Sequence, residues 1–199
     1  HITLVDTPGD PNFAEDGLVA LQALDGAVLA VSGVDGAKAG TDKMLRAADA
    51  RSMPAIAFIN GLDLERSDFE SALTSMKALT RTAVALTLPV GDAEELRGVI
   101  DLVDMVFIAA NGSKGEVPAE SSDRASTKRT ELIEAVAECD DSLLEKYLED
   151  GELGDDDLRA GLISGVHSQQ LLPVLAGSAT TEIGTASLLE AITTLLPSP

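Results

Sequence analysis

Three short apolar runs, each followed by a polar or glycine-rich loop, constrain the fold of this chain most strongly. They occupy residues 27–31, 55–59 and 171–175. Segments with a helical pattern separate them, and strands that are apolar almost throughout are typical of a parallel sheet covered on both faces. We therefore predict an α/β fold with a mainly parallel sheet and helices on both sides.

A further apolar run begins the chain and ends in an aspartate and a tight turn. Its composition predicts a strand over residues 2–6, followed by Thr7, Pro8 and Gly9. A carboxylate such as Asp6 at the carboxyl end of a strand lies where open α/β sheets bind ligands. P-loop nucleotidases hold Mg²⁺ and sense a terminal phosphate with this order of elements. The alternative is an ordinary strand-to-turn connection with a structural aspartate.

One of the other runs also ends in residues suited to ligand binding. Asn60 and Asp63 follow the run at residues 55–59, and their side chains can hydrogen-bond the edge of a base. Because parallel strands end at the same edge of a sheet, the strand ends at Asp6 and at Asn60 together favour a binding site over a purely structural interpretation. A small-residue loop with Gly177 follows the run at residues 171–175.

The pattern changes after residue 82. Residues 83–90 are extended, and residues 96–102 and 105–110 are strand candidates close enough to pair antiparallel. Helical segments follow a turn-rich stretch at residues 111–115. Three consecutive aspartates at residues 155–157 are interpreted as a solvated helix start rather than a cation site, because they lack the ligand spacing of a calcium loop.

Composition excludes several classes of partner. The 199 residues include 34 acidic and 14 basic side chains, for a formal charge of −20. Such a surface repels phosphate backbones and anionic lipids, so we expect neither direct nucleic-acid binding nor membrane binding. No apolar run is long enough for a membrane span, and no signal peptide is visible. The single cysteine, Cys139, fits a reducing cytosol, so we expect a cytoplasmic location. His167 is expected to be a surface residue.

The motifs at the ends of these runs resemble those of translational GTPases in order and spacing. The similarity extends over essentially the whole chain and is to elongation factor G and the elongation factor G-like proteins. The wide separation of Asp63 from Ser178 is also similar, because elongation factor G carries an inserted subdomain there. The residues that the resemblance assigns to nucleotide binding are Asp6, Thr7, Pro8, Gly9, Asn60, Gly61, Leu62, Asp63, Gly177, Ser178 and Ala179.

The resemblance implies three regions and a P-loop-GTPase-like fold. Residues 1–82 would be a partial G domain, residues 83–167 an inserted α+β subdomain, and residues 168–199 the last strand and helix of the G domain. In the family, a strand and a phosphate-binding loop precede the position of His1, so the chain looks cut from something longer. Loss of that central strand would leave the strand at residues 2–6 to pair beside residues 27–31, to self-associate with another copy, or to fray. We favour the first two outcomes, because fraying would expose apolar side chains.

The resemblance also implies roles for individual residues. Asp6 would hold Mg²⁺ through water, and the Gly9 amide would contact the γ-phosphate of GTP. Asn60 and Asp63 would read guanine and reject adenine, which lacks the donors that the Asp63 carboxylate needs. The loop with Ala179 and its neighbour Ser178 would contact the O6 side of the base.

This sequence departs from the family pattern at three points. No G-x-x-x-x-G-K-[ST] loop occurs in it, so most of the affinity for phosphate is missing. Asp10 occupies the position of a histidine that usually orients the attacking water, and a carboxylate there should slow hydrolysis. Gly61 replaces a lysine that stacks on the base. We therefore expect the chain alone to hold no cofactor tightly and to be inactive.

Two classes of function remain. In the first, the chain is part of an elongation factor G-like GTPase that binds GTP or GDP with Mg²⁺ and couples hydrolysis to translocation or a related step on the ribosome. The inserted subdomain would then contact the ribosomal stalk protein. In the second, it is a binding or regulatory module of this family that no longer hydrolyses GTP. Asp10 and Gly61 favour the second class, whereas Asp6, Gly9 and Asn60 favour the first.

Overall fold

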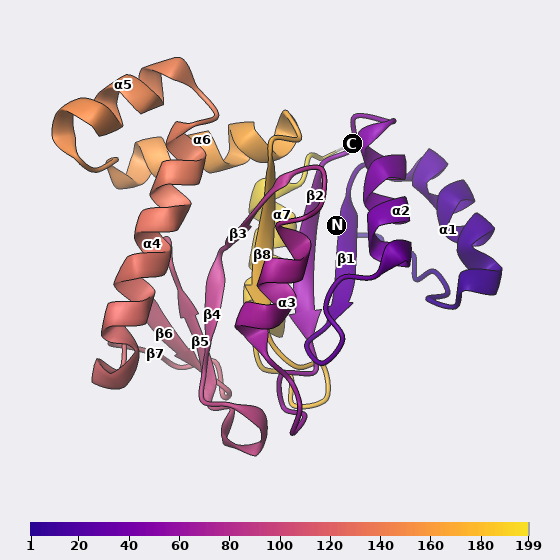
Figure 1. The fold of residues 1–199 in the computed structure, drawn as a ribbon, viewed down its shortest axis with the longest axis horizontal. Coiled ribbons are helices and arrows are strands. Elements are labelled where there is room, and N and C mark those ends of the chain that lie inside the picture. Colours follow the sequence, from indigo (N-terminus) through magenta and orange to yellow (C-terminus); the bar gives the residue numbers. More distant parts are fainter. Residues whose placement is uncertain (199) are drawn as a thin grey trace.

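A parallel sheet lies at the centre of the computed structural model, which describes residues 1–198 and, apart from Pro11, their side chains (Figure 1). Its four strands, in spatial order, are β1 (Ala27–Ser32), β2 (Ala55–Asn60), β8 (Leu171–Ala176) and β3 (Thr82–Ala85). All neighbours pair in parallel, with Ala27 opposite Ala55 and Ala57 opposite Val174. The predicted α/β class is therefore confirmed, as are the strands predicted from three of the apolar runs.

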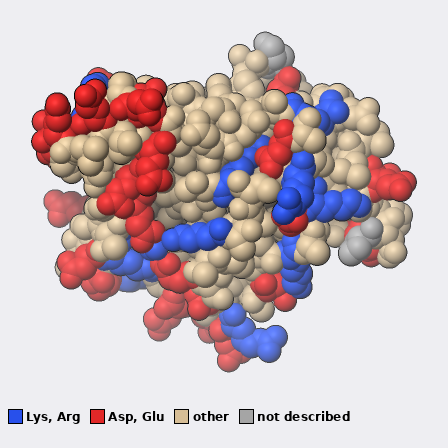
Figure 2. Space-filling view, turned by 45° about the horizontal axis from the view of Figure 1, so that its top comes forward, with Lys and Arg blue, Asp and Glu red and all other residues tan. Residues whose placement is uncertain are grey.

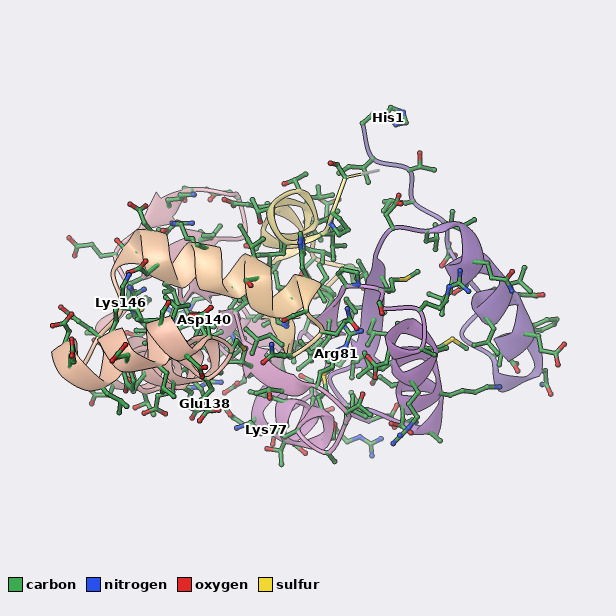
Figure 3. All side chains as sticks on the ribbon, turned by 90° about the horizontal axis from the view of Figure 1, so that it is seen from above. His1, Lys77, Arg81, Glu138, Asp140 and Lys146 are labelled. Atoms are coloured by element: carbon green, nitrogen blue, oxygen red, sulfur yellow. The ribbon has the colours of Figure 1, made fainter. Side chains whose placement is uncertain are left out.

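Helices cover both faces of this sheet. α2 (Ala39–Asp49) and α3 (Phe69–Met76) lie on one face, and α7 (Thr185–Leu195) lies on the other, as Figures 1 and 3 show. β2 and β8 are buried almost completely, which agrees with strands that have apolar side chains on both faces. β1 differs because it lies at an edge, with Leu29 and Val31 buried but Val28 exposed.

The predicted strand over residues 2–6 is wrong. Residues 1–9 form neither helix nor strand, and they lead through a short 3-10 helix (Pro11–Phe13) into α1 (Ala14–Ala20). His1 lies at the far end of this segment, away from the body of the molecule (Figure 3). Leu4 is 71% exposed. The segment therefore does not close the gap beside β1, because a strand needs a hydrogen-bonding neighbour as well as a suitable composition. Self-association stays a prediction.

A second, antiparallel sheet lies beside the first. Its strands are β4 (Thr87–Val90), β5 (Gly98–Asp101), β6 (Val106–Ala109) and β7 (Lys114–Gly115). The predicted antiparallel pairing of the two central strands is confirmed. The extended stretch predicted at residues 83–90 divides at Leu86 between the two sheets. The Leu86 N–H donates to Val174 of β8 at 2.8 Å, and its carbonyl accepts from Leu102 at 3.0 Å, so this one residue joins both sheets.

Three helices pack against one another and against this region. They are α4 (Ser122–Ala137), α5 (Asp141–Asp150) and α6 (Asp155–His167). The apolar face of α4 is buried, including Leu132 and Val136, and the aspartates at residues 155–157 do begin a helix. None of the helices in residues 1–198 combines the length and the apolar character needed to cross a bilayer. The three predicted regions stay a prediction, and Pro199, the last residue of the third, lies outside the described residues.

Helix boundaries depend on capping more than the sequence pattern indicates. α3 begins at Phe69, because the Asp68 side chain accepts a hydrogen bond from the Ser71 N–H at 3.0 Å and so fixes the N-terminus. α2 begins at Ala39, and the Thr41 hydroxyl in its first turn accepts from the Lys38 N–H at 3.3 Å.

A buried ion pair connects α2 to the start of β3. Arg81 is 3% exposed, and its Nε donates to Oδ1 of Asp49 at 2.6 Å. Its Nη2 donates to the carbonyl of Met53 at 2.7 Å. Because the guanidinium is almost wholly removed from water, its charge depends on these partners for compensation.

Replacing Asp49 by alanine should therefore lower the free energy of unfolding by about 3 kcal/mol, because the buried Arg81 charge loses its partner. The matched control is Asp42→Ala, which breaks an exposed pair with Arg46 in the same helix and should cost less than about 0.5 kcal/mol. Urea denaturation measures both. Equal losses in the two variants would contradict a special role for the buried pair.

Candidate functional site

The carboxyl ends of β1, β2 and β8 meet at one edge of the parallel sheet, at the bottom of Figure 1. The loops that follow β2 and β8 lie side by side there. Leu62 N–H donates to the Gly177 carbonyl at 3.2 Å, and Gly177 N–H donates to Ile59 at 3.0 Å. The structure thus brings together the two groups of residues, after the second and third apolar runs, that the resemblance assigns to base recognition.

Asn60 is the residue that holds these loops in place. Its side-chain Oδ1 accepts a hydrogen bond from the Ala179 N–H at 2.8 Å. Its backbone carbonyl accepts from the Gly33 N–H at 2.7 Å. Asn60 therefore connects the loops after all three strands. The sequence does not reveal the contact between Gly33 and Asn60, because this contact depends on the sheet register.

Asp63 has a carboxylate that the protein does not fully satisfy. Its Oδ1 is buried and has no hydrogen-bond partner among the described residues. A buried acceptor without a donor costs about 1–3 kcal/mol. Because Asp63 lies in the same loop as Asn60, a ligand with N–H donors that bound here would supply the missing partner. The residues present therefore fit the base that the resemblance implies.

The loop after β8 is a closed turn. Ser178 is fully buried, donates its N–H to Ile183 at 2.9 Å, and accepts at Oγ from the Thr181 N–H at 3.2 Å. A Cβ added to Gly177 would lie 2.2 Å from the Ile183 carbonyl oxygen, so only glycine fits. This turn presents the exposed Ala179 at the edge of the sheet.

Gly61 has a backbone conformation that explains its identity. Its φ is +77°, in the left-handed region that glycine adopts readily. A side chain here would be disfavoured by about 1–2 kcal/mol. Leu62 next to it is buried and anchors the loop, whereas Gly61 and Asp63 on either side are only partly buried.

The predicted phosphate and metal residues lie apart from this group. Asp6, Thr7, Pro8 and Gly9 are exposed, and within residues 1–198 they form no hydrogen bond to the loops after β2 and β8. No group of three or more acidic, histidine or cysteine side chains in the described residues is placed to hold a metal ion.

Asp10 has a local structural role. Its Oδ1 accepts from both the backbone N–H and the side-chain amide of Asn12, each at 2.8 Å. The Asp10 carboxylate therefore forms a local turn at the start of the 3-10 helix, and both of these hydrogen bonds come from Asn12. The sequence could not reveal this competing role, because an Asx turn and a catalytic position can use the same residue type.

A parallel sheet flanked by helices, with an antiparallel sheet beside it, places the chain in the class of G-domain-like α/β folds. The family model for the elongation factor Tu GTP binding domain matches residues 1–198. The chain belongs to this family, the GTP-binding domains of translation elongation factors.

Solved structures give the same result for the fold. A crystal structure of a protein from Thermus thermophilus is similar, with a TM-score of 0.88 and 31% sequence identity. The similarity covers 98% of this chain and 30% of that one, so the chain spans about 30% of the length of that protein. The resemblance to translational GTPases is thus confirmed at the level of family and fold.

Replacing Asn60 by alanine should lower the free energy of unfolding by about 1 kcal/mol, because the Ala179 N–H loses its acceptor. Amide exchange at Ala179 should accelerate in the same variant. Asn111→Ala is the control, since Asn111 accepts from the Ser113 N–H at 3.0 Å in an exposed turn of the antiparallel sheet. Unchanged exchange at Ala179 would show that Asn60 does not hold the two loops together.

Proposed function

We propose that this chain is the guanine-reading part of an elongation factor G-like GTPase that acts in translation. The observation that carries the proposal is the link from Asn60 Oδ1 to the Ala179 N–H beside the unpartnered Oδ1 of Asp63. In this family such a protein couples binding and hydrolysis of GTP to a step on the ribosome, and translocation is the step we propose.

The chemistry of base recognition follows from Asp63. Its carboxylate accepts from the ring N–H and the 2-amino group of guanine, whereas adenine offers neither and would leave the carboxylate unpaired. Ala179 would donate its N–H to the guanine O6. Because that N–H is bound to Asn60 in the structure, binding exchanges one hydrogen bond for another, which limits the affinity gained there.

Phosphate and Mg²⁺ would be held by the segment before α1. When bound, Mg²⁺ would stabilise the negative charge of the phosphates, and Asp6 would hold it through water. Asp6 and Gly9 lie in an exposed segment without a strand partner, and the sequence contains no phosphate-binding loop motif. Base recognition is therefore the main contribution of this chain, and tight nucleotide binding requires further phosphate contacts.

A second candidate function is a binding or regulatory module that does not hydrolyse GTP. The specific observation in its favour is the engagement of Asp10 by Asn12, since Asp10 occupies the position expected to orient the attacking water. Single-turnover hydrolysis by the longer protein that contains this chain distinguishes the two candidates.

The chain should bind GDP in the presence of Mg²⁺ with a dissociation constant weaker than about 1 μM, and ADP not measurably, because base contacts remain while most phosphate contacts are missing. NMR titration should show GDP-dependent shifts in the loops after β2 and β8.

Asp63→Asn should reduce GDP binding and admit xanthosine diphosphate, whose C2 carbonyl accepts from an amide. Glu65→Gln, in the same exposed loop, is the control. Equal shifts with ADP would contradict base recognition, and a submicromolar constant would contradict the missing phosphate contacts.

The proposed contact with the acidic ribosomal stalk protein can be assessed from the charges on α4, α5 and α6. Acidic side chains gather over α5, at the upper left of Figure 2. The basic residues of α4 are all engaged, with Arg124 bound to Glu70, Lys128 to Glu131 and Arg129 to the carboxylate at position 155. They therefore form no free basic face that would attract an acidic partner.

Binding of the stalk protein to this chain should consequently be weak and should strengthen as added salt screens the repulsion between like charges. Titration at two salt concentrations measures this. A tight complex that is indifferent to salt would show that an apolar contact, rather than charge, controls the interaction.

A further inference from the structure

A partly enclosed cavity of about 160 Å³ lies where α6, α7 and both sheets meet. Its walls include Thr87 at the start of β4, Leu162 of α6 and Ala191 of α7. The turn after β5 borders it on the side of the antiparallel sheet. None of the residues assigned to nucleotide binding lines it, so it is a separate feature of the fold.

The inner part of this cavity is apolar. Leu86, Leu162, Leu175, Ala191 and Leu195 line it, and all five are buried in the protein core. An apolar cavity of roughly 150 Å³ is large enough to accept benzene. The space therefore suits a ligand with a compact apolar body of about six to eight heavy atoms.

A buried hydroxyl without a partner also belongs to the lining. Ser187, in the first turn of α7, is 6% exposed, and its Oγ has no hydrogen-bond partner among the described residues. A buried polar atom of this kind is stabilised when a ligand or a water molecule supplies the missing hydrogen bond. This observation is independent of the shape of the cavity, and it provides a polar contact for a ligand that binds there.

Carboxylates dominate the charge around the entrance. Asp101, Asp104 and Glu190 line the cavity, and Asp104 and Glu190 are exposed at its rim. The one cation in the lining, Arg159, is already paired with Asp104. Asp101 is held in place because its Oδ1 accepts from the Val103 N–H at 2.8 Å and the Asp104 N–H at 3.0 Å. Burial raises the pKa of the Asp101 carboxyl, and the neighbouring charges of Asp104 and Glu190 raise it further. An incoming cation would compensate the charges of these carboxylates, whereas an anion would add to their repulsion.

We propose that this cavity binds a small primary amine with a compact apolar body. The apolar body occupies the space between α6, α7 and β8, and the ammonium group lies at the entrance beside Asp101 and Glu190. The hydroxyl of Ser187 supplies a further polar contact. An anion is excluded by the excess of carboxylates, and water alone would leave the apolar walls in contact with solvent.

Benzylamine is a suitable test ligand, and NMR titration of the whole chain reports where it binds. We expect saturable shifts at residues 101–104 and 187–195. Benzyl alcohol should bind roughly tenfold more weakly than benzylamine because it lacks the charge. Methylamine should bind no better than benzyl alcohol because it lacks the apolar body. Benzoate should not bind. Equal binding of benzoate or methylamine, or shifts spread over the acidic surface instead of the cavity, would overturn the proposal.

Two variants test the cavity itself. Ala191→Leu fills the space and should abolish benzylamine binding, with urea denaturation showing whether the protein remains folded. Glu190→Gln, at an exposed position, should weaken benzylamine binding severalfold without affecting benzyl alcohol, so it tests the charge without disturbing the core. Glu149→Gln on α5 is the matched control and should have no effect. Binding that survives both Ala191→Leu and Glu190→Gln would show that the ligand does not occupy this cavity.

Discussion

The parallel pairing of β2 with β8 is the contact on which the rest of this molecule depends. Both strands are buried, and their register places Ile59 opposite Ala176. The loops that follow them therefore lie side by side, and the Ala179 N–H comes within hydrogen-bond distance of the Asn60 side chain. The antiparallel sheet depends on the same pair, because Leu86 attaches it to β8 through Val174. One register thus positions the candidate site and the second half of the fold.

Apolar runs predicted the strands β1, β2 and β8. They did not predict the structure where a strand depends on having a neighbour to pair with. Residues 2–5 have the composition of a strand and form none, because composition reports a preference for burial and not the presence of a neighbour. Leu86 is a second example. Its sequence pattern predicts one continuous extended stretch, yet its backbone forms hydrogen bonds to two different sheets, which no local pattern reveals.

The candidate site was predictable in part for similar reasons. Asn60 and Ser178 could be placed at one edge because parallel strands align their ends, and the family spacing named the residues. The buried, unpartnered oxygen of Asp63 and the engagement of Asp10 by Asn12 could not be predicted, since both depend on distances of a few ångströms within loops. The proposed chemistry rests on these two details, because one leaves a buried carboxylate oxygen without a partner and the other engages a carboxylate expected near the phosphate.

The proposed base site and the cavity are connected by a short path of covalent and hydrogen bonds. Thr87 lines the cavity, and its Oγ1 accepts from the Ala176 N–H at 2.8 Å, one residue before the turn that begins at Gly177. Ser187 lies just after the same turn, in the first turn of α7. A ligand in the cavity can change binding at the base site only if it alters the position or the order of this turn. Any such effect would be reciprocal, so guanine binding would change the affinity of the cavity for the amine by the same factor.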